Sequence, residues 1–188
     1  ALYGYYDKVP FETMYLGHNI NSDYPVDELY NELITTGIVG VVNGKAEFGP
    51  RALGNRSLLA DPNRKLIIKT VNDIKQRECF RPYGAVIPEE LFNKYFYAKV
   101  NSSPYMQYVY KCKDFKKFKS ILNIDHTCRV QTINEKQNKG LYELLIKFYK
   151  TTGCPMLLNT SLNIKGKPIV NSKQDGENFG KKYNIKVF

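Results

Sequence analysis

The residues best suited to chemistry lie in a glycine-rich run at residues 44–61, which reads GKAEFGPRALGNRSLLAD. It combines three glycines with Lys45, Arg51 and Arg56. Glycine-rich turns present backbone N–H groups, and fixed cations beside them attract an anion. Arginine is rare in this chain, since only six of its 28 basic residues are arginine, at positions 51, 56, 64, 77, 81 and 129. Because the planar guanidinium suits bidentate binding of phosphate or carboxylate, we predict an anion site here.

A second basic cluster, IKQRECFRP, spans residues 74–82 and contains Lys75, Arg77 and Arg81. On an extended segment, the period of two would place Lys75 and Arg77 on one face, where both could bind one phosphate or carboxylate. The alternative is an ordinary exposed Lys-x-Arg pair, and the spacing alone does not separate the two interpretations.

Two further clusters are polar. Asn159, Ser161 and Asn163 follow a short apolar run, and at the end of a strand they could hydrogen-bond a small ligand. The alternative is that they form turns or caps, which is the commoner role of these residue types. Arg129 lies inside a strand-like pattern, which indicates either a salt bridge or a ligand.

Composition limits the classes of function. The length of 188 residues is enough for one domain with its own core. The net charge of +10 is spread mainly over lysines, and the densest run, at residues 111–119, fits a solvated face better than a nucleic-acid contact. Four widely spaced cysteines favour a reducing compartment over a disulfide framework or a zinc site. We therefore expect a cytoplasmic protein without a metal site of its own.

Several other sites are absent from the sequence. His18 and His126 are too isolated to indicate a metal site or a catalytic triad. Neither the Walker nor the Rossmann glycine pattern is present, and no apolar run is long enough to cross a bilayer.

Apolar periodicity predicts the elements that must position these clusters. Strands and helices mix without strict alternation, which favours an α/β or α+β sheet domain. We expect an extended lead-in and a short helix over residues 1–37 and a sheet domain over residues 38–188. The predicted strands are 38–42, 83–87, 105–110, 127–133 and 155–158, and the predicted helices are 25–36, 66–74, 88–96 and one that is capped by Asn134 and ends near Gly153.

Together these clusters resemble the C-terminal domain of the O-carbamoyltransferase family, which includes nodulation and antibiotic-tailoring enzymes. The resemblance runs from about residue 14 to about residue 179, in matching order and spacing. Its segments read GKAEFGPRALGNRSLLAD, IKQRECFRPYGAVIPEE, TCRVQT and TGCPMLLNTSLNIKGKPIV. It implies an α/β, YrdC-like mixed sheet flanked by helices.

The resemblance also implies an activity. Such a domain binds ATP, with Mg²⁺ on the nucleotide, and carbamoyl phosphate, and it forms carbamoyl-adenylate. A separate N-terminal actin-like domain, which contains a metal in the family, passes the carbamoyl group to an acceptor hydroxyl. We expect that domain to lie outside this chain, which would then be the activating half of a longer enzyme. A homodimer stays open, and the alternative is a non-catalytic basic module that binds nucleotides or nucleic acid.

Residue roles follow from the same resemblance. Lys75, Arg77, Ser161 and Asn163 match the Lys-x-Arg and Ser-x-Asn tetrad that surrounds the ligand in YrdC-like domains, and we take them as catalytic. The residues expected to bind carbamoyl phosphate or ATP, or to support that site, are Lys45, Arg51, Arg56, Arg81, Arg129 and Asn159. Arg56 is alternatively a partner of Glu47.

One segment departs from the family pattern. Where the family commonly has His-Val-Asp-Gly, this chain has Asn123-Ile124-Asp125-His126. The absent histidine, and a histidine in place of glycine, put the conformation of this loop or its acceptor chemistry in question.

Overall fold

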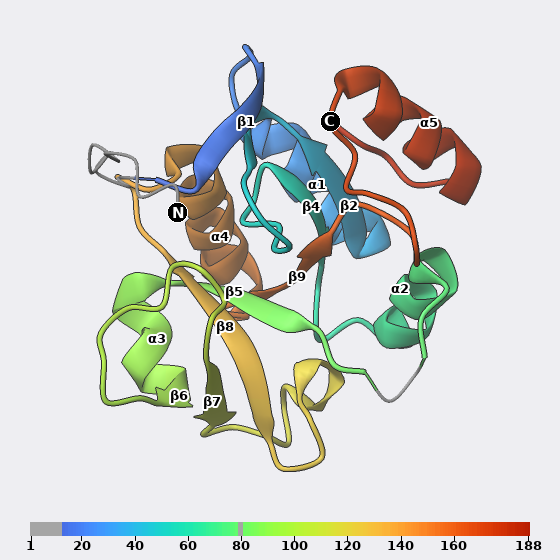
Figure 1. Cartoon of the computed structure of the whole chain (residues 1–188). Helices are drawn as coiled ribbons and strands as arrows, with labels where there is room; N and C mark the ends of the chain where they lie inside the picture. Colours follow the sequence, from blue (N-terminus) through green and yellow to red (C-terminus); the bar gives the residue numbers. More distant parts are fainter. Residues whose placement is uncertain (1–12, 79–80) are drawn as a thin grey trace, which may run out of the picture.

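A seven-stranded mixed sheet forms the centre of the fold in the computed structural model, which describes residues 13–78 and 81–188 (Figure 1). Only β5 and β8 run parallel to each other, and the other neighbouring strands are antiparallel. The order across the sheet is β2 (Ile38–Val42), β4 (Arg56–Ala60), β9 (Leu157–Ser161), β5 (Gly84–Pro88), β8 (Thr127–Ile133), β7 (Val109–Cys112) and β6 (Phe96–Tyr97). The predicted α/β class, a mixed sheet flanked by helices, is confirmed.

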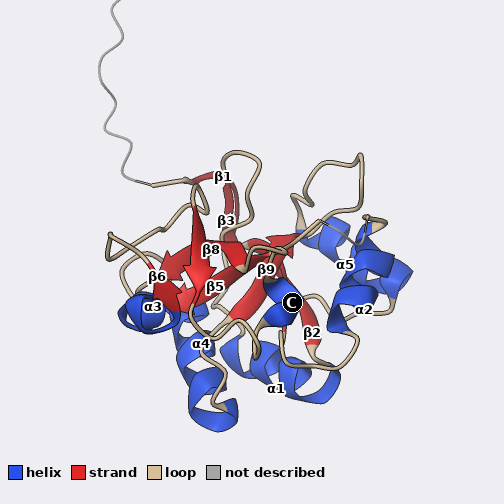
Figure 2. Cartoon of the chain, turned by 90° about the horizontal axis from the view of Figure 1, so that it is seen from below, coloured by secondary structure: helices blue, strands red, loops and turns tan. Residues whose placement is uncertain are grey.

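Helices cover one face of this sheet, and a strand pair lies on the other side. α1 and α4 pack against each other beneath β2 and β5, whereas the antiparallel pair of β1 (Tyr15–Ile20) and β3 (Gly44–Glu47) lies above the sheet (Figure 2). The helices are α1 (Val26–Thr36), α2 (Ile67–Lys75), α3 (Glu89–Tyr95), α4 (Lys139–Thr152) and α5 (Lys173–Tyr183), with a short 3-10 helix η1 (Lys119–Ile121).

The central strands are buried on both faces, as the apolar run at residues 38–42 predicts for β2. Every residue of β2, β4 and β5 is buried, and Leu141, Leu144 and Phe148 of α4 fill the space below them. No helix among the described residues is long and apolar enough to span a bilayer.

Three predicted boundaries are wrong, and the simplest case is the strand predicted at residues 155–158, which lies at Leu157–Ser161 and so includes Asn159. Asn134 does exchange reciprocal hydrogen bonds with Gln137, but these close a turn, and Asn138 caps α4 by accepting from the Leu141 N–H. The strand predicted at residues 105–110 begins only at Val109, because Met106 adopts a left-handed conformation with φ 51° that ends extended backbone.

Strand register places three residues of the candidate site in one row. Gly84 pairs with Asn159 of β9 on one side and with Arg129 of β8 on the other. Residues directly opposite each other point to the same face of a sheet. Asn159 and Arg129 therefore flank a position that carries no side chain.

Candidate functional site

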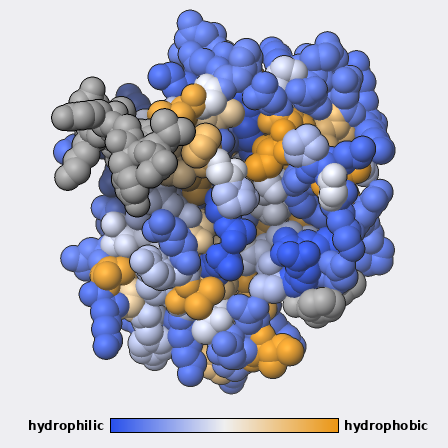
Figure 3. All heavy atoms as spheres, viewed as in Figure 1, coloured by the Kyte–Doolittle hydropathy of each residue, from blue (hydrophilic) through white to orange (hydrophobic). Residues whose placement is uncertain are grey.

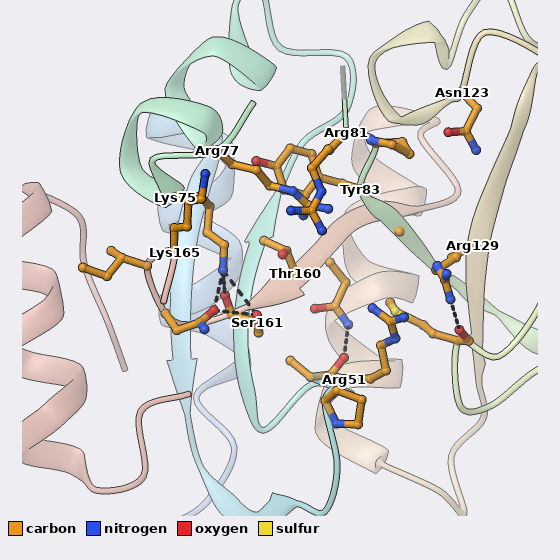
Figure 4. A pocket seen from close by; sticks show the side chains of 18 of the residues that line it. Arg51, Lys75, Arg77, Arg81, Tyr83, Asn123, Arg129, Thr160, Ser161 and Lys165 are labelled. Carbon is orange, nitrogen blue, oxygen red and sulfur yellow. Dashed lines mark hydrogen bonds between the residues drawn. The ribbon is translucent and has the colours of Figure 1, made fainter. Parts of the chain in front are cut away.

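A cavity of about 420 Å³ opens above this row of residues (Figure 4). Figure 3 shows strongly hydrophilic residues near the middle of the same face. The described lining of the cavity includes no acidic residue and six basic ones: Arg51, Lys75, Arg77, Arg81, Arg129 and Lys165. Such a concentration of positive charge favours a polyanionic ligand.

Lys75 forms one wall of the cavity from the last position of α2. Its buried ammonium donates to the Ser161 carbonyl, to Ser161 Oγ at 3.2 Å and to Asn163 Oδ1 at 2.6 Å (Figure 4). Burial, followed by repulsion from Arg77, lowers the pKa of Lys75 to about 7. The structure thus brings Lys75 into contact with Ser161 and Asn163, which follow it in the sequence by 86 and 88 residues.

Lys75 and Arg77 do not lie together on an extended segment, the condition under which the sequence would place both on one face. Lys75 is helical, and Gln76 ends the helix in a left-handed conformation with φ 49°. Both cations still line the cavity, because this residue turns the chain between them. The two-residue alternation of a strand therefore does not explain their shared position.

Arg77 is held over the ring of Tyr83, with its guanidinium carbon 5.0 Å from the ring centroid. The Tyr83 hydroxyl donates to Asn72 Oδ1 of α2 at 2.6 Å, which fixes the ring. Burial and the neighbouring Arg81 lower the pKa of the Arg77 guanidinium. Its Nε is buried without a partner among the described residues, so one donor remains for a ligand.

Arg51 and Arg129 supply positive charge on the other side of the cavity. Burial, then Arg129 and Arg77, lower the pKa of the Arg51 guanidinium. Arg129 makes a long contact of 3.5 Å between Nη1 and the Met106 carbonyl oxygen. Cations that repel one another in this way favour an anion between them.

The glycine-rich run does not offer its central N–H groups to a ligand, as the sequence had suggested. Glu47 Oε1 accepts from the N–H groups of Leu53, Asn55 and Arg56, at 2.6, 2.8 and 3.2 Å. The Gly54 N–H donates to Ser57 Oγ at 2.9 Å. A carboxylate of the chain itself therefore occupies this anion-binding turn.

Gly54 is required at its position in this turn. Its φ is 117°, and a Cβ built there would lie 2.5 Å from Cδ2 of Leu141. The tight turn brings Arg51 and Ala52 to the edge of the cavity.

Two of the predicted binding residues lie elsewhere. Lys45 is exposed on β3 and does not line the cavity. The Arg56 side chain is buried and donates to the backbone carbonyls of five residues. The carbonyls belong to His18, Asn43, Gly44, Asn55 and Asn171. Arg56 thus ties β4 to β1, β3 and the loop before α5, and its backbone, rather than its guanidinium, contacts Glu47.

Sequence reasoning missed Lys165 and Tyr83. Lys165 lines the cavity and donates to Glu78 Oε1 at 2.5 Å. This hydrogen bond holds the pKa of the Glu78 carboxyl low, at about 2. The repeated lysines of the Ile-Lys-Gly-Lys segment were the available signal, but only the fold shows which of them faces the ligand.

The loop that departs from the family pattern borders the cavity through Asn123. His126 adopts the left-handed conformation, with φ 66°, at the position where the family commonly has glycine. Its ring stacks on Phe115, with centroids 4.2 Å apart and planes inclined by 20°. The Asn123 N–H donates to the Thr127 carbonyl at 2.7 Å, so the turn closes despite the substitution.

No residue of the basic run at residues 111–119 lines this cavity. Lys113 donates to the Asn93 carbonyl at 2.6 Å and lies over Tyr97, and Lys117 lies over the buried Phe118. These contacts agree with a solvated face.

Nothing among the described residues resembles a metal site: no group of three or more His, Cys, Asp or Glu could hold an ion. Cys79 lies outside the described residues. The other three cysteines are buried thiols, and burial raises the pKa of each. They therefore contribute to packing and not to chemistry at the cavity.

Comparison with known proteins places this geometry in a family. The model of the family Carbamoyltransferase C-terminus matches residues 30–188. Nodulation protein NolNO of Sinorhizobium fredii is 39% identical over 143 residues, covering 73% of this chain and 21% of that protein. The 3'-hydroxymethylcephem-O-carbamoyltransferase of Amycolatopsis lactamdurans is 37% identical over 149 residues, covering 79% of this chain and 28% of that protein.

A solved structure shares the fold. HypF in its phosphate- and nucleotide-bound form has a TM-score of 0.62 at 16% identity, covering 87% of this chain and 24% of that chain. The chain thus spans between about a fifth and under a third of the length of these proteins. Because the family model covers most of the sequence, the chain belongs to the family of carbamoyltransferase C-terminal domains.

Proposed function

We propose that this chain is the activating domain of a carbamoyltransferase, which binds ATP and carbamoyl phosphate and forms carbamoyl-adenylate. The observation that carries the proposal is the cavity itself, whose described lining has six basic residues and no acidic one. Its volume of about 420 Å³ lies within the usual range for small-molecule sites.

The proposed chemistry requires charge stabilisation more than a general base. Water splits carbamoyl phosphate into carbamate and phosphate, a carbamate oxygen attacks the α-phosphorus of ATP, and pyrophosphate leaves. Each step places negative charge on phosphoryl oxygens, which positioned cations stabilise. Lys75 and Arg77 lie on one side of the cavity and Arg51 and Arg129 on the other, so phosphoryl oxygens bound in the cavity would lie between them.

The described residues do not fit a protein-bound Mg²⁺. This ion prefers carboxylate and water oxygens, and the described lining of the cavity contains no carboxylate. In the proposed reaction Mg²⁺ therefore enters with the substrate, as MgATP. Transfer to an acceptor hydroxyl is assigned to the N-terminal actin-like domain that the family resemblance implies.

Pyrophosphate release tests this proposal. The protein is incubated with ATP and carbamoyl phosphate, together and separately, and binding of each ligand is measured in parallel. We expect release only with both ligands present, and a loss of about 100-fold or more in Arg77→Met, because a preorganised charge is removed.

Arg64→Met is the matched control. Arg64 donates to the backbone carbonyls of Ile34 and Thr35 and does not line the cavity, so release should persist. The proposal would be contradicted if the protein bound neither ATP nor carbamoyl phosphate. Binding without pyrophosphate release would limit the chain to a binding role.

A further inference from the structure

Two buried amides beside the cavity form a hydrogen-bonded chain that ends in an unsatisfied oxygen. Gln131 Nε2 donates to the Leu53 carbonyl at 2.8 Å, and Asn159 Nδ2 donates to Gln131 Oε1 at 2.8 Å. Asn159 Nδ2 also lies 3.3 Å from the Ala52 carbonyl oxygen. Gln131 is fully buried, and Asn159 is 1% exposed while lining the cavity.

The backbone fixes the orientation of both amides. A carbonyl oxygen only accepts hydrogen bonds, so Gln131 must turn its NH₂ group toward Leu53 and its oxygen toward Asn159. Asn159 must then present its nitrogen to Gln131, and the Ala52 carbonyl requires the same orientation. Asn159 Oδ1 is left buried, with no partner among the described residues.

An unpaired buried acceptor is costly, so its presence beside a cavity suggests a ligand that donates to it. The basic residues of the cavity suit the ionised oxygens of a phosphoryl group, and a fully ionised phosphoryl group only accepts hydrogen bonds, so by itself it leaves Asn159 Oδ1 unsatisfied. Gly84 separates Asn159 from Arg129 in the row and carries no side chain. A ligand with a phosphate beside an N–H donor therefore matches both features of this surface.

We propose that Asn159 Oδ1 accepts a hydrogen bond from the NH₂ group of carbamoyl phosphate, and that Gln131 positions it. This inference rests on the proposed function, which names that ligand. Acetyl phosphate has the same phosphate and nearly the same shape, but it carries a methyl group in place of NH₂. It would leave Asn159 Oδ1 unpaired, so the two amides select the carbamoyl group.

Binding of three ligands to the intact protein, measured by calorimetry, tests this selectivity. The ligands are carbamoyl phosphate, acetyl phosphate and inorganic phosphate. Wild type should bind carbamoyl phosphate at least about tenfold more tightly than acetyl phosphate. In Asn159→Leu, and in Gln131→Leu, where only the longer 3.3 Å contact with the Ala52 carbonyl still orients the Asn159 amide, this ratio should fall below about threefold.

A second buried amide provides the matched control. Asn43 donates to Ser22 and Asp23 and lies outside the cavity, so Asn43→Leu should keep the wild-type ratio even if it lowers stability. A merely structural role for Gln131 would lower stability in the same way without changing selectivity.

The remaining outcomes would each contradict the inference. Equal affinity of wild type for carbamoyl and acetyl phosphate overturns it, and this comparison needs no variant. A ratio that survives in Asn159→Leu, or that collapses equally in Asn43→Leu, also overturns it. These results leave the phosphate site standing, whereas failure of wild type to bind any of the three ligands contradicts the proposed function itself.

Discussion

Phosphate binding should be coupled to uptake of a proton by Lys75. Burial and repulsion from Arg77 lower the pKa of Lys75 from its usual 10.5 to about 7. At about pH 8, roughly nine-tenths of the free protein therefore carries a neutral amine at this position. A bound phosphate favours the ammonium form, so binding raises this pKa again.

The size of the effect follows from the shift. If the bound phosphate restores the usual pKa, about 0.9 proton enters with each ligand at about pH 8. The ligand itself contributes little, because a phosphate monoester is already ionised above its second pKa of about 6. Affinity should then fall about tenfold per pH unit from about pH 7 to about pH 10.

The free protein should show the matching trend in stability. Between about pH 7 and pH 10.5 the unfolded chain holds a proton on Lys75 that the folded chain has lost. Since the unfolded state binds more protons over this window, the free energy of unfolding rises with pH there.

Calorimetry of carbamoyl phosphate binding in buffers with different ionisation enthalpies measures the proton uptake directly. Lys165→Met is the matched control, because it removes an exposed cavity lysine and should leave the uptake unchanged. Uptake below about 0.2 proton in wild type at about pH 8 would refute the reasoning, as would unchanged uptake in Lys75→Met.

Three substitutions test other parts of the site. Glu47→Leu leaves three N–H groups without their acceptor and should lower the free energy of unfolding by about 3 kcal/mol in urea titrations. Arg56→Met removes the side-chain hydrogen bonds to five backbone carbonyls and should cost about 4 kcal/mol, whereas Lys45→Met should change stability by less than about 0.5 kcal/mol. Equal losses would contradict the assigned roles. Tyr83→Leu removes the ring beneath Arg77 and should weaken phosphate binding about threefold, whereas Tyr83→Phe should retain it.

Much of the sheet could be predicted because its strands are short apolar runs. The run at residues 38–42 forms β2, and the pattern at residues 127–133 forms β8. β4 was not predicted because it lies within the glycine-rich run, whose residue types are typical of a turn. Only Leu58 and Leu59, which are buried in β4, indicate a strand there. α5 was missed because its packing depends on two glycines; a Cβ at Gly176 would lie 2.7 Å from Val42 Cγ2.

The residues of the candidate site could likewise be predicted only in part from the sequence. Residue types and motif order identified Lys75, Arg77, Ser161 and Asn163, which do line one cavity. The row that joins Asn159, Gly84 and Arg129 depends on the pairing of three strands, and local periodicity does not encode that pairing.

Motif chemistry misled in one case. The glycine-rich turn is an anion-binding turn, but the anion it binds is the carboxylate of Glu47. A sequence shows that such a turn can form, and only the fold shows which group fills it. The cations that remain for a ligand come from other segments and from Arg51.

A crystal structure with a non-hydrolysable ATP analogue and phosphate tests the central claim most directly. We predict phosphate oxygens within hydrogen-bond distance of Arg77 Nε and the Lys75 ammonium, in the cavity above Gly84. Both ligands bound elsewhere, for example on the lysine-rich face at residues 111–119, with this cavity empty, would contradict it.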